Sequence, residues 1–169
     1  AEVVNRHLSR PWREPVASHN AGAIARLQEQ LRADGRPLVL DSFCGTGHST
    51  TVLAERHPDC LVIGIDKSAS RLARHPESPR PDYLLLQADC EPVWRFLADS
   101  GHYLRAHYLL YPNPWPKPGH LLRRTHGHPA FPYLVALGGR VELGLDLDIL
   151  LNLAAASYTF ETPVLGGRY

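Results

Sequence analysis

The stretch LVLDSFCGTGHSTTVLAER, residues 38–56, decides the fold of this chain. Its first three residues are apolar and predict a short buried strand, while Gly45 and Gly47 predict a tight turn. Residues 48–56 have the pattern of a helix, which Pro58 ends. A strand, a glycine turn and a helix in that order are typical of the first unit of an α/β fold. We therefore expect this stretch to begin a sheet that helices cover.

The same alternation continues along the rest of the chain. Helices are predicted over residues 21–33, 48–56, about 68–74, 92–98 and 149–156, and strands over residues 38–40, 61–66, 83–86, 106–110 and 141–145. Parallel neighbours need helical crossovers of right-handed sense, so the order predicts an α/β fold with a doubly wound, mostly parallel sheet. The connection over residues 124–138 is short for a full crossover because Pro129 and Pro132 interrupt it, which indicates a stunted helix or missing residues.

Length and composition indicate one globular domain. The 169 residues are 44% hydrophobic and 21% charged, enough for one core, and we expect a single domain over residues 1–169 with an N-terminal helical segment at about 1–36. The net charge is only +1, so any basic surface for nucleic acid has to be local. No apolar run has membrane-spanning length, and the first residues lack a signal-peptide pattern, which predicts a cytoplasmic protein.

The cysteines and histidines do not indicate a metal centre or a disulfide framework. Cys44, Cys60 and Cys90 are odd in number and widely spaced, so we interpret them as structural thiols. His126 and His128 lack a second ligand cluster at useful spacing and are interpreted as part of a polar loop.

Acidic residues end the first three predicted strands. These are Asp41, Asp66 and Asp89, and their recurrence at one edge of a parallel sheet predicts a nucleoside ligand there. A nicotinamide dinucleotide is one candidate, but Phe43 stands where the pyrophosphate fingerprint has its first glycine. S-adenosylmethionine fits better, because it has cations where a dinucleotide has phosphates. A purely structural turn, and helix capping by Asp66 and Asp89, are the alternatives.

A second informative stretch, YPNPWPKPGH at residues 111–120, follows the fourth strand. Its prolines predict a rigid turn at that strand's carboxyl end, where α/β folds bind ligands. Arg123 and Arg124 follow and add a local cluster of cations. Core packing of Trp115 and a solvated arginine turn are the alternative interpretations.

These motifs resemble a known family. Residues 41–47 resemble the first motif of class I S-adenosylmethionine-dependent methyltransferases, and residues 111–124 are similar to the signature of bacterial tRNA (guanine-N7)-methyltransferases. Residues 138–146 and 159–161 resemble two further motifs of that family. The chain departs from the pattern at Asn113, where the family has an acidic residue, which indicates a divergent member.

The resemblance implies a Rossmann-like class I fold and methyl transfer from S-adenosyl-L-methionine to N7 of guanine in tRNA. Asn113 is the implied catalytic residue, acting by hydrogen bonding and alignment. The implied cofactor-binding residues are Asp41, Phe43, Gly45, Gly47, Asp66, Asp89 and Asn113. The implied substrate-binding residues are Trp115, Lys117, His120, Arg123, Arg124, Asp146 and Glu161. No membrane partner is expected, and monomer and homodimer both stay open.

Two other functions stay open at this point. One is a methyltransferase of the same fold that acts on another base or amine, which the Asn113–Pro114–Trp115 corner partly imitates. The other is a non-catalytic RNA-binding relative, which the loss of the family's acidic residue favours.

Overall fold

The computed structural model describes residues 11–76, 82–110, 119, 122, 124–144 and 158–162. Within them the helices and strands follow in the order α2 (Ser18–Ala33), β1 (Leu38–Ser42), α3 (His48–Arg56), β2 (Leu61–Asp66), α4 (Ala69–Leu72), β3 (Tyr83–Gln87), α5 (Cys90–Asp99), β4 (Leu104–Leu110), the 3-10 helix η2 (Thr125–Gly127), α6 (Phe131–Ala136), β5 (Gly139–Gly144) and β6 (Tyr158–Thr162).

The strands form one six-stranded sheet in the order β3-β2-β1-β4-β5-β6. All neighbours are parallel except β5 and β6, which are antiparallel. The strand order reverses at β1, because β2 and β3 follow on one side of it and β4 and β5 on the other. The predicted doubly wound, mostly parallel sheet is confirmed, and the reversal is the place where such sheets bind ligands.

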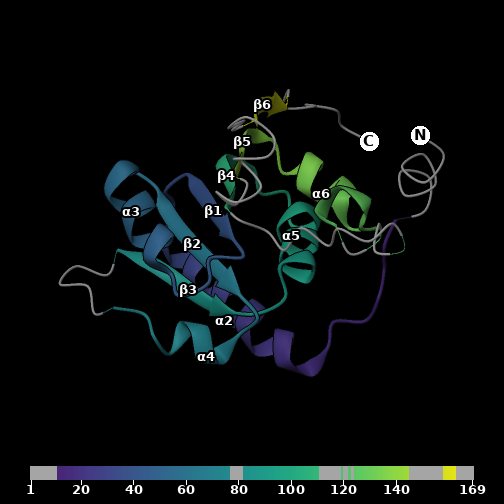
Figure 1. The fold of residues 1–169 in the computed structure, drawn as a ribbon, viewed down its shortest axis with the longest axis horizontal. Coiled ribbons are helices and arrows are strands. Elements are labelled where there is room, and N and C mark those ends of the chain that lie inside the picture. The colour runs from purple at the N-terminus through teal and green to yellow at the C-terminus, as the bar shows by residue number, and fades with distance from the viewer. Residues whose placement is uncertain are drawn as a thin grey trace.

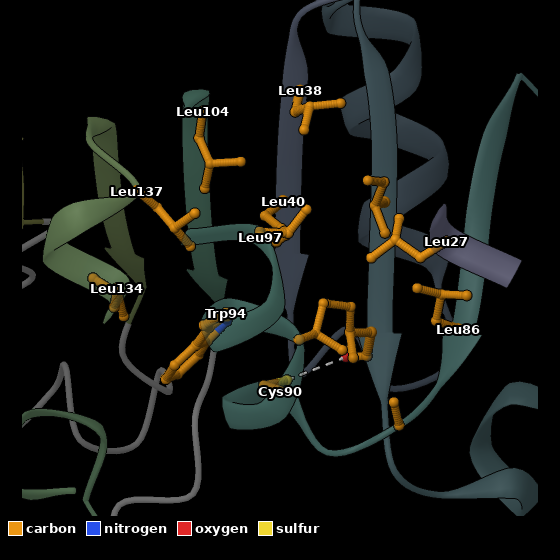
Figure 2. Packing of buried hydrophobic residues seen from close by; sticks show 14 of the residues in the cluster. Leu27, Leu38, Leu40, Leu86, Cys90, Trp94, Leu97, Leu104, Leu134 and Leu137 are labelled. Carbon is orange, nitrogen blue, oxygen red and sulfur yellow. Dashed lines mark hydrogen bonds between the residues drawn. The ribbon is translucent and has the colours of Figure 1, made fainter. Parts of the chain in front are cut away.

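Helices cover both faces of the sheet (Figure 1). On one face α5 and α6 lie side by side, and α2 contacts α5 and β3. Alternate residues of β1 point to opposite faces, as the strand period requires: Leu40 packs under α5, and Val39 packs toward α3. Figure 2 shows Trp94 and Leu97 of α5 among the leucines of the larger core.

Several element bounds differ from the sequence prediction. Helix α2 begins at Ser18, and β4 begins at Leu104. The crossover after β4 contains a stunted helix, α6, with a proline in its first turn and Gly138 in a left-handed conformation (φ 65°) just after it. Strand β6 was not predicted, although its sequence YTFET alternates apolar and polar residues. The helix expected at 149–156 lies outside the described residues.

None of the helices in the described ranges is both long and apolar enough to cross a membrane.

Candidate functional site

The glycine turn between β1 and α3 closes over the end of β2. The backbone N–H of Cys44 donates to the Ile65 carbonyl at 3.0 Å, and the N–H of Gly45 donates to Asp66 Oδ2 at 3.0 Å. Phe43 has the left-handed φ of 64° that a glycine usually provides in such turns. Its ring packs edge-on against Trp94, with centroids 6.0 Å apart. The aromatic contact therefore offsets a backbone strain of about 1–2 kcal/mol.

Gly47 ends the turn, and its missing side chain is required. A Cβ at Gly47 would lie 2.8 Å from Nδ1 of His75. That nitrogen lies 2.8 Å from the Thr46 carbonyl, which can only accept, so Nδ1 carries the proton and Nε2 accepts from the Tyr83 hydroxyl at 2.6 Å. His75 thus ties the turn to β3, a role that sequence reasoning missed because no pattern relates His75 to the turn 29 residues earlier.

Asp41 lies on β1 and is fully buried. Its Oδ2 accepts hydrogen bonds from the hydroxyls of Ser49 and Thr50, both at 2.7 Å, whereas its Oδ1 has no partner among the described residues. Gly64 is in register with Asp41, and a side chain there would collide with Thr50. Burial raises the pKa of Asp41, and the two hydroxyls only partly oppose that effect. The free oxygen can therefore accept a donor or a cation from a ligand.

Asp66 is the last residue of β2 and is 3% exposed. Besides the bond from Gly45, its Oδ1 accepts the backbone N–H of Ser68 at 2.8 Å. Ser68 caps α4, since its hydroxyl accepts the N–H of Arg71. The capping interpretation of Asp66 is therefore wrong, and Asp66 instead joins the glycine turn to the segment after β2.

Asp89 stands at the N-cap position of α5, yet its side chain makes no capping bond. Its Oδ2 accepts from His19 Nε2 at 2.8 Å and from Asn20 Nδ2 at 3.1 Å. Burial acts to raise the pKa of Asp89, but the bonds from His19 and Asn20 outweigh it, and the pKa is lowered. Capping by the Asp89 side chain is therefore not observed, and the partners on α2 could not be found from sequence, because they lie 69 and 70 residues away.

The carboxylates of Asp41, Asp66 and Asp89 share one edge of the sheet, which we call the acid-lined edge. The glycine turn links Asp41 to Asp66, and the N–H of Ala88 donates to the Asp66 carbonyl at 3.2 Å, which places Asp89 beside it. The carboxylate oxygens of this edge can accept hydrogen bonds from the amino and hydroxyl groups of a nucleoside, whereas the oxygens of an ionised diphosphate have no hydrogen to donate. Asp41 Oδ1, which has no partner in the described part of the chain, is thus chemically suited to S-adenosylmethionine, which has an amino group and a sulfonium cation.

Cysteine chemistry does not contribute to this edge. All three cysteines are free and buried, which confirms the prediction of structural thiols. Burial, with the nearby Asp41 charge, raises the pKa of Cys44 to about 12, so its thiol stays neutral. In the described ranges no group of His, Cys, Asp and Glu is arranged to hold a metal ion.

Only some of the residues predicted to bind the substrate lie within the described part of the chain. Arg124 precedes η2, and its carbonyl accepts the N–H groups of Gly127 and His128 at 2.9 Å. Glu161 lies on β6 opposite Arg140 in the backbone register. The remaining predicted residues lie outside the described part of the chain: Asn113, Trp115, Lys117, His120, Arg123 and Asp146.

Two relatives that share one name match most of this chain. The chain is 35% identical over 164 residues to a tRNA (guanine-N(7)-)-methyltransferase of Geobacillus thermodenitrificans, with 90% of this chain and 73% of that one covered. It is 33% identical over 136 residues to the protein of the same name from Rubrobacter xylanophilus, with 76% of this chain and 60% of that one covered.

A solved structure supports the fold. The antibiotic-resistance methyltransferase Kmr superimposes with a TM-score of 0.52 at 24% identity, covering 73% of this chain and 65% of Kmr.

Residues 35–149, more than half of the chain, match a family model described as "Putative methyltransferase". The sheet order, the acid-lined edge and these similarities agree, and the chain belongs to the tRNA (guanine-N7)-methyltransferase family of class I S-adenosylmethionine-dependent methyltransferases.

Proposed function

We propose that this chain transfers the methyl group of S-adenosylmethionine to N7 of guanine in tRNA, and that it does so in the cytoplasm. The observation that carries the proposal is the similarity to a tRNA (guanine-N(7)-)-methyltransferase over 90% of the chain. The acid-lined edge supports it independently, since its chemistry suits the cofactor. We also propose that residues 1–169 act as one domain.

The first three strands would hold the cofactor. Asp41 Oδ1 accepts from the amino group of the methionine part, Asp66 from the ribose hydroxyls, and Asp89 from the adenine amino group. The backbone of the turn, at Phe43, Gly45 and Gly47, allows close approach. When bound, S-adenosylmethionine supplies an electrophilic methyl group on a sulfonium cation. In its ionised form Asp41 would stabilise a nearby cation, so the site would favour the methyl donor over a neutral analogue.

The segments after β4 and β5 would hold the base. Guanine N7 has a free lone pair, so the chain needs to align the base rather than remove a proton. Asn113 would donate or accept a hydrogen bond without a charge, and Trp115 would form a wall of the base pocket. The remaining contacts to the guanine edge and to phosphates would come from Asp146, Glu161, Lys117, His120, Arg123 and Arg124.

The test is a single-turnover assay with unmodified tRNA and a labelled methyl donor, followed by mass spectrometry of the nucleosides. We expect 7-methylguanosine. Asn113→Asp should preserve or raise the rate, because a carboxylate adds electrostatic stabilisation, and Asn113→Ala should lose most turnover. Methylation of another nucleoside would support a different substrate on the same fold. A parent chain that binds cofactor and tRNA but transfers nothing would identify an RNA-binding relative.

A further inference from the structure

The first turn of α2 holds Asp89 in a two-way contact. Asn20 is 1% exposed, its Oδ1 accepts the Asp89 backbone N–H at 2.9 Å, and its Nδ2 donates to Asp89 Oδ2 at 3.1 Å. His19 donates to the same Oδ2 at 2.8 Å and keeps a side chain that is 62% exposed. One buried and one exposed residue of α2 therefore fix both the backbone and the carboxylate of Asp89.

This contact competes with helix capping. Aspartate is among the favoured N-cap residues, and Asp89 has the extended conformation (φ −69°, ψ 140°) from which such residues cap. Its carboxylate nevertheless makes no bond to α5. The donors of α2 hold it away from its own helix. The carboxylate would otherwise accept a hydrogen bond from a backbone N–H in the first turn of α5. It is instead kept available at the edge of the sheet.

The arrangement leaves one oxygen available. Both donors meet Oδ2, and Asp89 Oδ1 receives no hydrogen bond from the described residues. The carboxylate is 34% exposed and its pKa is lowered, so it is ionised at neutral pH and can only accept. Its neighbour along the edge is Asp66. A ligand that lies along this edge has to present an N–H or O–H group to Oδ1.

We propose that Asn20 and His19 are positioning residues that aim Asp89 Oδ1 at the 6-amino group of adenine, so that the chain selects adenine over a 6-oxo purine. The inference rests on the proposed function, because it takes the ligand of the edge to be an adenosine cofactor. A 6-oxo purine presents an acceptor at that position, which would face the carboxylate and leave it unpaired. The first turn of α2 is then part of the specificity of the cofactor site.

The experiment is calorimetric binding of S-adenosylhomocysteine and of its inosine counterpart to the full chain. We expect the parent to prefer the adenine form by roughly ten- to a hundredfold, the range for a hydrogen bond to a charged group. Asn20→Ala and His19→Ala should reduce that preference, Asn20→Ala the more because it loses two bonds. His19→Gln should retain more of the preference than His19→Ala, since glutamine can still donate. Arg26→Ala is the matched control, because Arg26 joins α2 to the Leu85 carbonyl at 3.4 Å and not to Asp89.

The outcomes separate the inference from the proposed function. Because His19 is exposed, His19→Ala stays informative even where Asn20→Ala fails to fold. Variants that lower the affinity for both ligands equally, or that keep the adenine preference of the parent, would overturn the positioning role. A parent that binds both ligands equally would also overturn it. A parent that binds neither ligand and methylates no tRNA would instead refute the proposed function.

Discussion

Asp41 and Ser42 are consecutive residues of β1, and the strand directs them to opposite faces of the sheet. Asp41 meets the hydroxyls of α3, while Ser42 accepts from Trp94 Nε1 at 2.9 Å and bonds His107 Nε2 at 2.8 Å. Both are fully buried, and each region has one atom that finds no partner among the described residues, Asp41 Oδ1 and His107 Nδ1.

The two regions differ in whether their central side chain can carry a charge. Asp41 is ionisable and adjoins the glycine turn, where a ligand can supply the missing partner. His107 lies opposite Trp94 in the core, and burial lowers its pKa to about 3, so it is neutral at physiological pH. One strand thus supplies a carboxylate to the acid-lined edge on one face and a neutral polar network on the other. Only the edge is expected to respond to the cofactor.

The largest expected effect is on the free energy of unfolding, through the polar network of Ser42, Trp94 and His107. Trp94→Ala should lower the free energy of unfolding by about 3–5 kcal/mol, because it empties a fully buried site and removes the ring that anchors Phe43. Trp94→Phe should cost less, since it mainly loses the bond to Ser42. Urea denaturation measures both. A cost below about 1 kcal/mol for Trp94→Ala would show that the network does not support the fold.

The next effect is a pH dependence that belongs to His107. Its folded pKa of about 3 lies below its ordinary value of 6.5, so the unfolded chain takes up the proton first as pH falls. Stability is therefore lost as pH falls from about 6.5 toward 3, by about 2 kcal/mol between pH 7 and pH 5. In His107→Gln this part of the loss should be absent. Equal acid sensitivity of both proteins would mean that His107 is not buried as a neutral ring.

A smaller effect, on ligand affinity, is expected on the other face of the sheet, at Asp41. Because burial raises its pKa, a proton competes with the ligand as pH falls through that value. The affinity for S-adenosylhomocysteine should fall by up to about tenfold per pH unit in that range. Asp41→Asn should bind more weakly and should not show this dependence. Calorimetry across pH measures it, and a variant with the parent's affinity would place Asp41 outside the cofactor contact.

The smallest expected effect lies between the two regions, at Phe43. Phe43→Gly removes the strain of φ 64° but also the contact with Trp94, terms of similar size and opposite sign. We expect the free energy of unfolding to change by less than about 1 kcal/mol. Cofactor affinity should stay within about threefold, because the backbone of the turn is retained. A large loss of affinity would indicate that the Phe43 ring itself contacts the cofactor.

The acid-lined edge could be predicted from the sequence better than the polar network around His107, because its signals are local. Strand ends, glycines and acidic residues are local signals, so the sheet, the glycine turn and the places of Asp41 and Asp66 followed from them. The partners of these residues did not, because Asn20 and His75 reach the edge through contacts across 69 and 29 residues. His107 gave no signal at all, since a histidine within an apolar strand looks the same whether it packs or reacts. The roles of Asn113 and Trp115 stay predictions.

We expect the acid-lined edge, and not the neighbouring polar network, to bind the cofactor. The most direct measurement is calorimetric titration of S-adenosylmethionine into the parent, Asp66→Ala and His107→Gln. Asp66→Ala should lower the affinity roughly ten- to a hundredfold, since a charge-assisted bond to ribose is lost. His107→Gln should bind like the parent. Unchanged affinity in Asp66→Ala, or an equal loss in both variants, would show that Asp66 does not hold the cofactor at this edge.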